Sequence, residues 1–311
     1  MKAMVCTAYG PPEVLQLQEV AKPIPKDHEV RIKIYATTVN SGDCRVRGFR
    51  SPLLYKIPMR LVLGLRKPRQ PILGVELAGE VEAIGQDVTR FKIGDQVLAF
   101  RGMRFGTYAQ YICMHEDGMI VMKPEHVTYD DAAAIFFGGT TALHFFRKAN
   151  IRQGHKVLIY GASGAVGNLA VQLAKHAGTV VTGVCSTVNV ELVKSLGADQ
   201  VVDYTQEDIS KSGDRYDIIL DAVGKLPKSR CKHLLAAGGS YVTVEGQGVA
   251  KVLMEDLRRL TDLLGEGKIK PVIDRRYALE QIAEAHRYAD TGRKRGSVVI
   301  TVGHDHCGKK S

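Results

Sequence analysis

Three glycines spaced three residues apart, Gly161, Gly164 and Gly167, follow a short apolar run and open a segment with helical periodicity. Such a strand–turn–helix unit lets the backbone turn tightly, approach a ligand closely and pack the helix against the strand. The free N–H groups and the positive end of the helix then favour a pyrophosphate. The spacing therefore predicts a dinucleotide site, with contacts from Gly161, Ala162, Ser163, Gly164, Ala165 and Val166.

The elements that position this turn belong to a pattern that changes along the chain. Up to about residue 122, segments such as 14–20 and 30–35 alternate apolar and polar residues with period two, which indicates strands. From about Thr128 onward, strands alternate with helices, which is typical of a doubly wound parallel sheet and of an α/β fold. Strands are expected at 156–160, 179–185, 200–203, 216–220, 239–244 and 296–302, and helices at 165–177, 188–196, 230–236, 255–264 and 279–289, with further helices starting at Asp130 and Gly138.

The net charge of the 311-residue chain is +10, which invites an anionic partner. Basic residues gather in a segment without Asp or Glu: Arg45, Arg47, Arg50, Lys56, Arg60, Arg66, Lys67 and Arg69. A solvated basic rim accounts for them better than a nucleic-acid surface, because no nucleic-acid motif or pattern of interleaved aromatic residues accompanies the charge. We therefore do not expect nucleic acid as a partner.

The six cysteines are scattered, without a Cys-x-x-Cys pair, which argues against a disulfide framework and a structural zinc site. Most lie in apolar patterns, and Cys44 and Cys307 are expected to be the more exposed thiols. No apolar run reaches the roughly 18 residues that would suggest a membrane span. The N-terminus runs straight into a strand pattern without a signal peptide, so we expect a cytoplasmic location.

Several short motifs occur in an order that resembles the medium-chain dehydrogenase/reductase superfamily, and within it the zinc-independent quinone oxidoreductase branch. They are residues 40–43 (Asn-Ser-Gly-Asp), 74–79 (Gly-Val-Glu-Leu-Ala-Gly), 94–97, 139–142, 161–167, 196–199 and 221–224. The resemblance covers nearly the whole chain. It implies a β-rich GroES-like catalytic domain from residues 1–122 plus 270–303, a Rossmann nucleotide-binding domain from residues 123–269, and a tail at 304–311.

Two zinc-ligand positions of the superfamily hold other residues in this chain. Zinc-dependent members carry a Cys three residues before the aspartate that Asp43 matches, and Asn40 stands there. They carry a His where this chain has Val75. Zinc needs three or four N, S or O ligands at fixed geometry, so these replacements predict that the chain binds no zinc.

Cofactor choice depends on the end of the second strand of the nucleotide domain, where NAD-binding proteins carry an acidic residue. Here the strand runs into Ser186 and Thr187, and the first acid is Glu191 in the next helix. We therefore expect no carboxylate that would repel a 2′-phosphate. The resemblance implies NADPH, held by Ser186, Thr187, Asn189 and Tyr204, with Val223 as a further cofactor contact. Close relatives often have a basic residue at the position of Val188, which leaves NADH as an alternative. Plain helix capping is the other explanation of Ser186 and Thr187.

The resemblance further implies hydride transfer from the nicotinamide to a quinone or an α,β-unsaturated carbonyl, with the cofactor carrying the chemistry. Asn40 and Asp43 would line the nicotinamide cleft, and Thr141, at a helix start, would touch the nicotinamide or its ribose. A helix cap explains Asp43 as well as a catalytic role does. Tyr55 and His144 are candidate proton donors, but His144 reads better as a core histidine, and solvent is an alternative source of the proton.

Relatives usually carry a longer segment after Val244, with a strand that pairs across a dimer interface. Here the segment is short, and residues 249–254 are the only candidate for that strand, so the sequence leaves a homodimer open. Two other functions also remain open: an NADH-dependent, alcohol dehydrogenase-like enzyme, and a non-catalytic nucleotide- or RNA-binding protein of the same fold.

Overall fold

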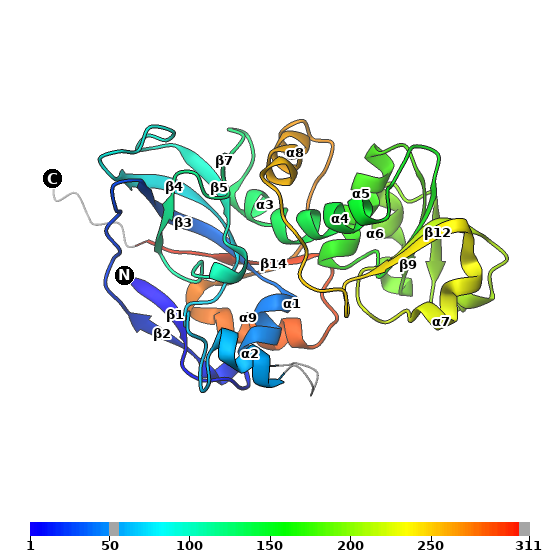
Figure 1. The fold of residues 1–311 in the computed structure, drawn as a ribbon, viewed down its shortest axis with the longest axis horizontal. Helices are drawn as coiled ribbons and strands as arrows, with labels where there is room; N and C mark the ends of the chain where they lie inside the picture. The colour runs from blue at the N-terminus through cyan, green and yellow to red at the C-terminus, as the bar shows by residue number, and fades with distance from the viewer. Residues whose placement is uncertain (50–55, 305–311) are drawn as a thin grey trace. The chain divides into compact units, whose positions relative to one another are not determined.

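The computed structural model describes residues 1–49 and 56–304 (Figure 1). For residues 56–59 it describes the backbone alone. The chain forms two compact units. Unit 1 consists of Met1–Ala134, Ile273–Lys294 and the chain from Val298 onward, and unit 2 of Ile135–Val272 and Arg295–Ser297. In the described part of the chain, no helix is long and apolar enough to cross a membrane.

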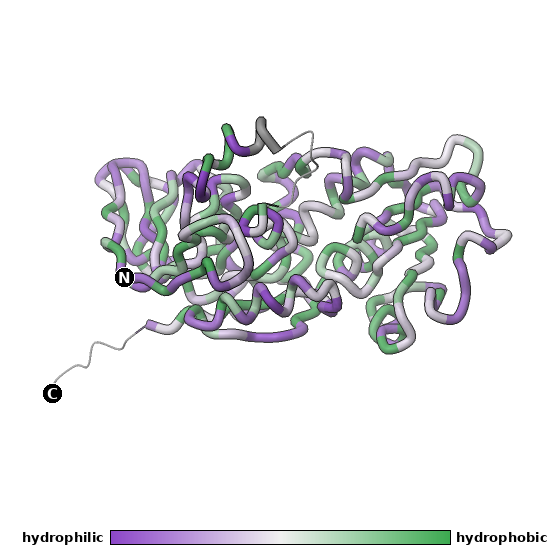
Figure 2. The backbone as a smooth tube through the Cα atoms, turned by 90° about the horizontal axis from the view of Figure 1, so that it is seen from below, coloured by the Kyte–Doolittle hydropathy of each residue, from purple (hydrophilic) through white to green (hydrophobic). Residues whose placement is uncertain are grey.

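Unit 1 is built on a sheet in which β3 (Glu29–Val39) is the central strand. It pairs antiparallel with β4 (Glu76–Ile84), β6 (Tyr111–His115) and β14 (Ser297–Thr301). The sheet continues through β5 (Gln96–Phe100) and β7 (Ile120–Met122) on one side and β13 (Ile273–Ala278) on the other, and β1 (Lys2–Cys6) pairs with β2 (Leu15–Glu19) separately. Period-two patterning is confirmed in β3, where Val30, Ile32 and Ile34 are fully buried between less buried residues. Figure 2 shows hydrophobic (green) and hydrophilic (purple) residues changing places over short stretches along the backbone.

The helices of unit 1 come from both ends of the chain. They are α1 (Ser41–Arg47), α2 (Lys56–Leu63), α3 (Tyr129–Ala133) and α9 (Ile282–Asp290). Figure 1 shows α9 and β14, drawn in orange and red, among the blue N-terminal elements of this unit. The last part of the chain therefore returns to complete the β-rich, GroES-like unit.

Unit 2 is a five-stranded parallel sheet in the order β10-β9-β8-β11-β12. The strands are β8 (Lys156–Tyr160), β9 (Val180–Cys185), β10 (Gln200–Asp203), β11 (Tyr216–Asp221) and β12 (Leu235–Thr243). The helices are α4 (Phe136–Lys148), α5 (Ala165–His176), α6 (Val190–Ser195), α7 (Lys228–Cys231) and α8 (Met254–Gly265). Strand order reverses beside β8, which is where open α/β sheets bind ligands. The predicted α/β class with a Rossmann-type sheet is confirmed.

One element prediction in unit 2 is wrong. The helix expected at 230–236 ends earlier, because Leu235 and its neighbours already pair with β11 as the start of β12. Residues 249–253, part of the candidate for a strand across a dimer interface, carry no strand in this single chain, and α8 begins at Met254. A strand of that kind takes its hydrogen bonds from a second copy of the chain.

Two exposure predictions in unit 1 are also wrong. Cys44 is buried rather than exposed, because α1 packs against α9. Arg47 belongs to the basic segment but is only 1% exposed, and its guanidinium pairs with Asp290 of α9. Arg45, Arg60, Arg66, Lys67 and Arg69 are exposed as expected. Arg50 and Cys307 lie outside the described residues.

The buried pair of Arg47 and Asp290 generates a stability prediction. Arg47→Ala leaves the Asp290 carboxylate, whose side chain is 16% exposed, without this partner, and should lower the free energy of unfolding by about 3 kcal/mol. Denaturant unfolding measures the change. The matched control is Arg66→Ala, an exposed arginine of the same segment, which should change stability by about 0.5 kcal/mol at most. Equal effects of the two variants would contradict the prediction.

Candidate functional site

The glycine-rich turn between β8 and α5 shows which of its glycines the fold itself requires. Gly161 has φ +81°, and a Cβ there would lie 2.5 Å from Cγ1 of Val223. A Cβ on Gly167 would lie 2.1 Å from the carbonyl oxygen of Gly161. Gly164 has φ −77°, and a Cβ there would meet nothing closer than that same oxygen, at 3.4 Å. Residues 161 and 167 must be glycine for packing, whereas Gly164 leaves open space over the turn.

The start of α5 supplies hydrogen-bond donors to that space. Gly164 is its N-cap and has no side chain that could satisfy the first N–H groups of the helix. The turn itself is held firmly: the N–H groups of Gly161 and Ala162 both donate to the Val184 carbonyl at 3.0 Å, and Gly296 N–H donates to the Ser163 carbonyl at 2.8 Å. A fixed turn with free N–H groups at a helix start fits the pyrophosphate of a dinucleotide.

Val223, a predicted cofactor contact, is placed beside the turn by a residue that sequence reasoning missed. Asp221, at the end of β11, is 1% exposed. Its carboxylate accepts from the N–H groups of Val223, Gly224 and Leu226 at 3.2, 2.8 and 2.9 Å. These bonds shape the bend that brings Val223 against Gly161. The Asp-Ala-Val-Gly motif was visible in the sequence, but only the fold shows which N–H groups the aspartate binds.

The residues predicted to hold the adenosine phosphate gather at the end of β9. Ser186 Oγ accepts from Nδ2 of the buried Asn189 at 3.1 Å, and Thr187 Oγ1 lies 2.8 Å from Thr205 Oγ1. Tyr204 is 52% exposed and stacks on Tyr160 with ring centroids 6.3 Å apart. Ser186 occupies an N-cap position but makes no side-chain cap bond, so the capping explanation fails for it.

Asp203 contradicts the expectation that no carboxylate lies at this corner. Parallel pairing sets Asp203 of β10 opposite Cys185, the last residue of β9. Its Oδ1 accepts from the N–H and hydroxyl groups of Thr205, at 2.9 and 2.8 Å. A hydrogen bond from the Thr187 side chain helps to hold the pKa of Asp203 below its usual value. Along the chain the first acid after the second strand is Glu191, whereas strand register brings in Asp203 from the third strand.

In unit 1, Asn40 and Asp43 cap the start of α1 reciprocally. Asp43 N–H donates to Asn40 Oδ1 at 3.1 Å, and Asn40 N–H donates to Asp43 Oδ2 at 3.2 Å. Both are buried, at 2% and 0% exposure. This capping box confirms the structural explanation of Asp43. Because Oδ1 of the Asn40 amide is engaged, its Nδ2 is the free end, and it has no hydrogen-bond partner within the described chain.

Two further buried residues complete this polar cluster. Tyr108 donates its hydroxyl proton to Asp43 Oδ2 at 2.9 Å, and His286 Nε2 lies 3.2 Å from the same hydroxyl. Burial raises the pKa of Asp43 to about 7, against the hydrogen bonds from Asn40 and Tyr108 that lower it. Neither residue was predicted from the sequence. Tyr108 lies in a strand-like run, and His286 lies on an amphipathic helix 178 residues further along the chain.

The other predicted residues lie elsewhere in unit 2 or outside the described chain. Thr141 is not at a helix start: α4 begins at Phe136, and the Thr141 hydroxyl donates to the Phe137 carbonyl at 2.6 Å. His144 is not a core histidine either. It is half-buried, and its Nδ1 accepts from Lys251 N–H at 3.2 Å. Tyr55 lies outside the described residues.

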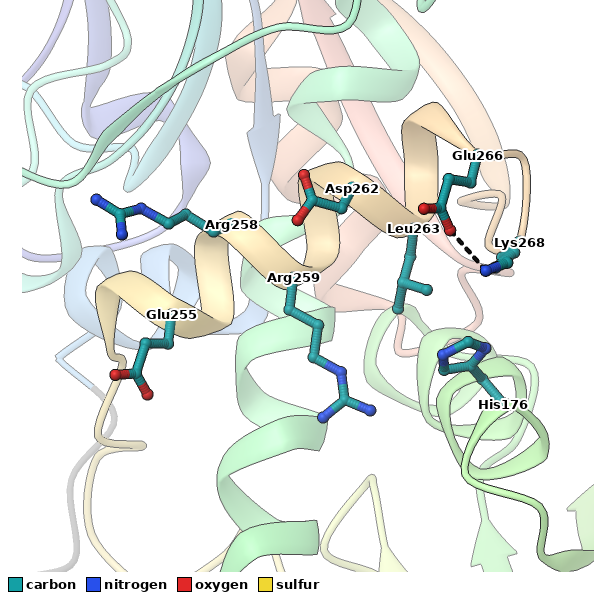
Figure 3. A pocket seen from close by; sticks show the side chains of 8 residues that line it. All are labelled: His176, Glu255, Arg258, Arg259, Asp262, Leu263, Glu266 and Lys268. Carbon is teal, nitrogen blue, oxygen red and sulfur yellow. Dashed lines mark ion pairs between the residues drawn. The ribbon is translucent and has the colours of Figure 1, made fainter.

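A charged hollow of about 390 Å³ on unit 2 contains none of the predicted site residues (Figure 3). It is lined by His176 of α5 and by residues of α8 and the turn after it, with both signs of charge alternating along the helix: Glu255, Arg258, Arg259, Asp262, Glu266 and Lys268. Such a surface fits solvent better than a ligand of one charge. Across the described residues, no three His, Cys, Asp or Glu side chains are grouped so that they could hold a metal ion.

Family models match most of the chain. The model of the alcohol dehydrogenase GroES-like domain matches residues 26–125, and two models of zinc-binding dehydrogenases match residues 165–270 and 250–300. The chain is 34% identical to a 2-methylene-furan-3-one reductase of Solanum lycopersicum, over 96% of this chain and 79% of that protein. It is 31% identical to a chloroplastic NADPH-dependent alkenal/one oxidoreductase of Arabidopsis thaliana, with the same coverage.

A solved structure shows the same fold over nearly the whole chain. The quinone oxidoreductase from Coxiella burnetii superimposes with a TM-score of 0.86 at 30% identity, covering 97% of this chain and 99% of that one.

Because a side chain fits at Gly164, a substitution there can test dinucleotide binding without disturbing the fold. Gly164→Asp should abolish dinucleotide binding, because its carboxylate would meet the pyrophosphate, while aspartate as an N-cap should preserve or raise the melting temperature. Fluorescence titration and thermal unfolding measure the two effects. Gly167→Ala is the contrasting variant and should destabilise the fold. Unchanged dinucleotide affinity in Gly164→Asp would refute this site.

Proposed function

Because this chain belongs to the medium-chain dehydrogenase/reductase superfamily, we propose that it is a zinc-independent reductase that uses NADPH to reduce a quinone or an α,β-unsaturated carbonyl. The observation that carries this proposal is the buried amide of Asn40. It stands where zinc-dependent members have a ligand, and its Nδ2 has no hydrogen-bond partner within the described chain. The names of the relatives, an enone reductase, an alkenal/one oxidoreductase and a quinone oxidoreductase, support the substrate class.

The residues at the two ligand positions do not fit zinc. An amide engaged in a capping box stands at 40, and an apolar side chain that is 7% exposed stands at 75. Cys44, the thiol next to Asp43 along the chain, lies against His286 Nδ1 at 3.5 Å, and burial raises its pKa to about 12. Zinc binds the thiolate, so this thiol is a poor ligand. We therefore derive no step through a metal.

Different residues of the chain would bind the cofactor and polarise the carbonyl group of the substrate. When bound, NADPH supplies the hydride. The turn at 161–166 and the start of α5 would hold its pyrophosphate, with Val223 beside the turn and Thr141 as a contact of the nicotinamide or its ribose. Asn40 Nδ2 would donate a hydrogen bond to the carbonyl oxygen of the electrophile, which makes the conjugated carbon more electron-poor. Solvent supplies the proton that completes the reduction.

At the end of β9, some residues favour NADPH as the cofactor and others favour NADH. Ser186, Thr187, Asn189 and Tyr204 offer donors to a 2′-phosphate, and a relative named as NADPH-dependent supports this choice. Asp203 and the 75% exposed Val188 favour NADH instead, because one is negative and the other offers no charge. We propose NADPH as the preferred cofactor, with NADH accepted less well.

We favour a reductase over an RNA-binding protein, because Arg47 of the basic segment is neutralised inside the fold. The short segment after Val244 forms no strand among the described residues of the single chain, so a homodimer through this segment requires the strand to form on association. We propose a cytoplasmic location, although the relative from Arabidopsis thaliana is named as chloroplastic.

A substrate panel tests the function. NADPH oxidation should be observed with quinones and enones, and should be slower with NADH. Saturated aldehydes and ketones, which lack an electron-poor conjugated carbon, serve as the control substrates. Absence of turnover with every quinone and enone, in protein that binds NADPH, would refute the proposal.

Asn40→Ser tests the proposed donor. Serine keeps an N-cap for α1 but removes the amide, so stability should change little while kcat falls by about a hundredfold. Steady-state kinetics and thermal unfolding give the two readouts. If kcat is unchanged, Asn40 does not polarise the substrate.

Val188→Arg tests the cofactor corner. An arginine there should tighten NADPH relative to NADH by about tenfold, because it pairs with the 2′-phosphate. Asp203→Asn should act in the same direction by removing a negative charge. The matched control is Val249→Arg, a valine of the same unit that is 77% exposed, which should leave the ratio of dissociation constants unchanged. An equal ratio before and after Val188→Arg would show that the phosphate binds elsewhere.

A further inference from the structure

Four buried side chains of unit 1 form a continuous hydrogen-bonded row, which we name the Asp43 chain: Cys44, His286, Tyr108 and Asp43. Cys44 Sγ lies 3.5 Å from His286 Nδ1, His286 Nε2 lies 3.2 Å from the Tyr108 hydroxyl, and that hydroxyl lies 2.9 Å from Asp43 Oδ2. Each residue is at most 5% exposed. The row joins α1 to α9 through the segment before β6.

Hydrogen-bonding chemistry gives the Asp43 chain a direction. An ionised carboxylate only accepts, so Tyr108 must donate its one hydroxyl proton to Asp43. The tyrosine oxygen then accepts from His286, which places the histidine proton on Nε2. His286 Nδ1 is left as an acceptor, and the Cys44 thiol donates to it. Every donor in the row therefore points towards Asp43.

Burial keeps the three donors uncharged, so the direction of the row depends on the ionisation of Asp43 alone. Burial raises the pKa of Cys44 to about 12 and that of Tyr108 well above its ordinary value. Burial, with Arg47 nearby, lowers the pKa of His286 to about 3. Asp43 is the one member whose pKa, about 7, lies near neutrality. The charged groups that face the row are Arg47 of α1, Glu76 of β4, Asp290 of α9, and Lys294, whose positive charge lowers the pKa of Asp43.

We propose that Tyr108, His286 and Cys44 are positioning residues, which hold the Asp43 carboxylate and through it orient the Asn40 amide for substrate. Asp43 Oδ2 accepts from Tyr108 and from Asn40 N–H, while Asp43 N–H fixes Asn40 Oδ1. Only the buried Nδ2 end of that amide has no hydrogen-bond partner within the described chain. The proposal rests on the proposed function, since it assigns the machinery that supports the Asn40 donor.

The proposal implies that activity follows the ionisation of Asp43. Protonated Asp43 no longer requires the Tyr108 donor, and the row loses its single direction. Activity should therefore rise with pH through the pKa of Asp43. Tyr108→Phe removes a hydrogen bond that lowers this pKa, so the pKa, and the acidic limb of kcat/KM, should move upward by about one pH unit.

The experiment measures the Asp43 pKa directly as well as through activity. Carbon-13 NMR of protein labelled at aspartate Cγ follows the titration, and Asp43→Asn assigns the signal. Tyr108→Phe is compared with Tyr241→Phe, which loses a tyrosine hydrogen bond of 2.6 Å to the Leu226 carbonyl in unit 2 and should leave Asp43 unchanged. His286→Gln retains an N–H donor towards Tyr108, whereas His286→Leu does not, so the leucine variant should shift the pKa further.

The outcomes distinguish a positioning role of Tyr108 and His286 from a purely structural role. An upward shift in Tyr108→Phe and His286→Leu, with Gln at 286 closer to wild type, supports the proposal. Lower melting temperatures with an unchanged Asp43 pKa and pH profile would overturn it. If Tyr108→Phe does not fold, the two His286 variants decide. If wild-type protein reduces no quinone or enone, the proposed function fails, while the NMR titration still reports on the Asp43 chain.

Discussion

A carboxyl group with no exposed surface must be stabilised by donors or lose its charge, and Asp43 imposes this constraint on unit 1. Its partners come from three separate parts of the chain: Asn40 three residues before it, Tyr108 before β6, and, through that tyrosine, His286 of α9. The Arg47–Asp290 pair joins α1 and α9 again, four residues after Asp43. The return of the C-terminal segment to the first unit is thus needed both for packing and for satisfying buried polar groups.

Unit 2 follows a different constraint, which is steric rather than electrostatic. The turn at 161–167 can pass between β8 and α5 only if residues 161 and 167 lack a Cβ. Bonds from Gly161, Ala162 and Gly296 then hold the turn, and the N–H groups at the start of α5 are left for a ligand. Rigid backbone around free donors suits phosphate binding, because the cost of ordering is met during folding.

Each unit holds polar groups without a hydrogen-bond partner in the described chain on a rigid part of the fold. The Asn40 amide in unit 1 and the helix start in unit 2 each have donors that the fold does not use. The corner at the end of β9 is different, because Ser186 and Asn189 already bind each other and Asp203 adds a negative charge. A phosphate bound at this corner would have to displace existing hydrogen bonds, so the corner is less suited to one particular ligand than the turn at 161–167.

The sequence alone determined the features that depend on local spacing. The glycine spacing, the period-two strands of the first half and the alternation of strands and helices in the second half were enough to predict the α/β class and the tight glycine turn between β8 and α5. The Asn-x-x-Asp spacing was enough for the capping box, because both partners lie within one helical turn. Tertiary structure alone decided which distant groups meet. Strand register brought Asp203 beside Thr187, the packing of α1 on α9 buried Cys44 and Arg47, and the same packing joined His286 and Tyr108 to Asp43. No local pattern encodes these contacts, because they depend on segments that fold together only after long stretches of intervening chain have taken their places.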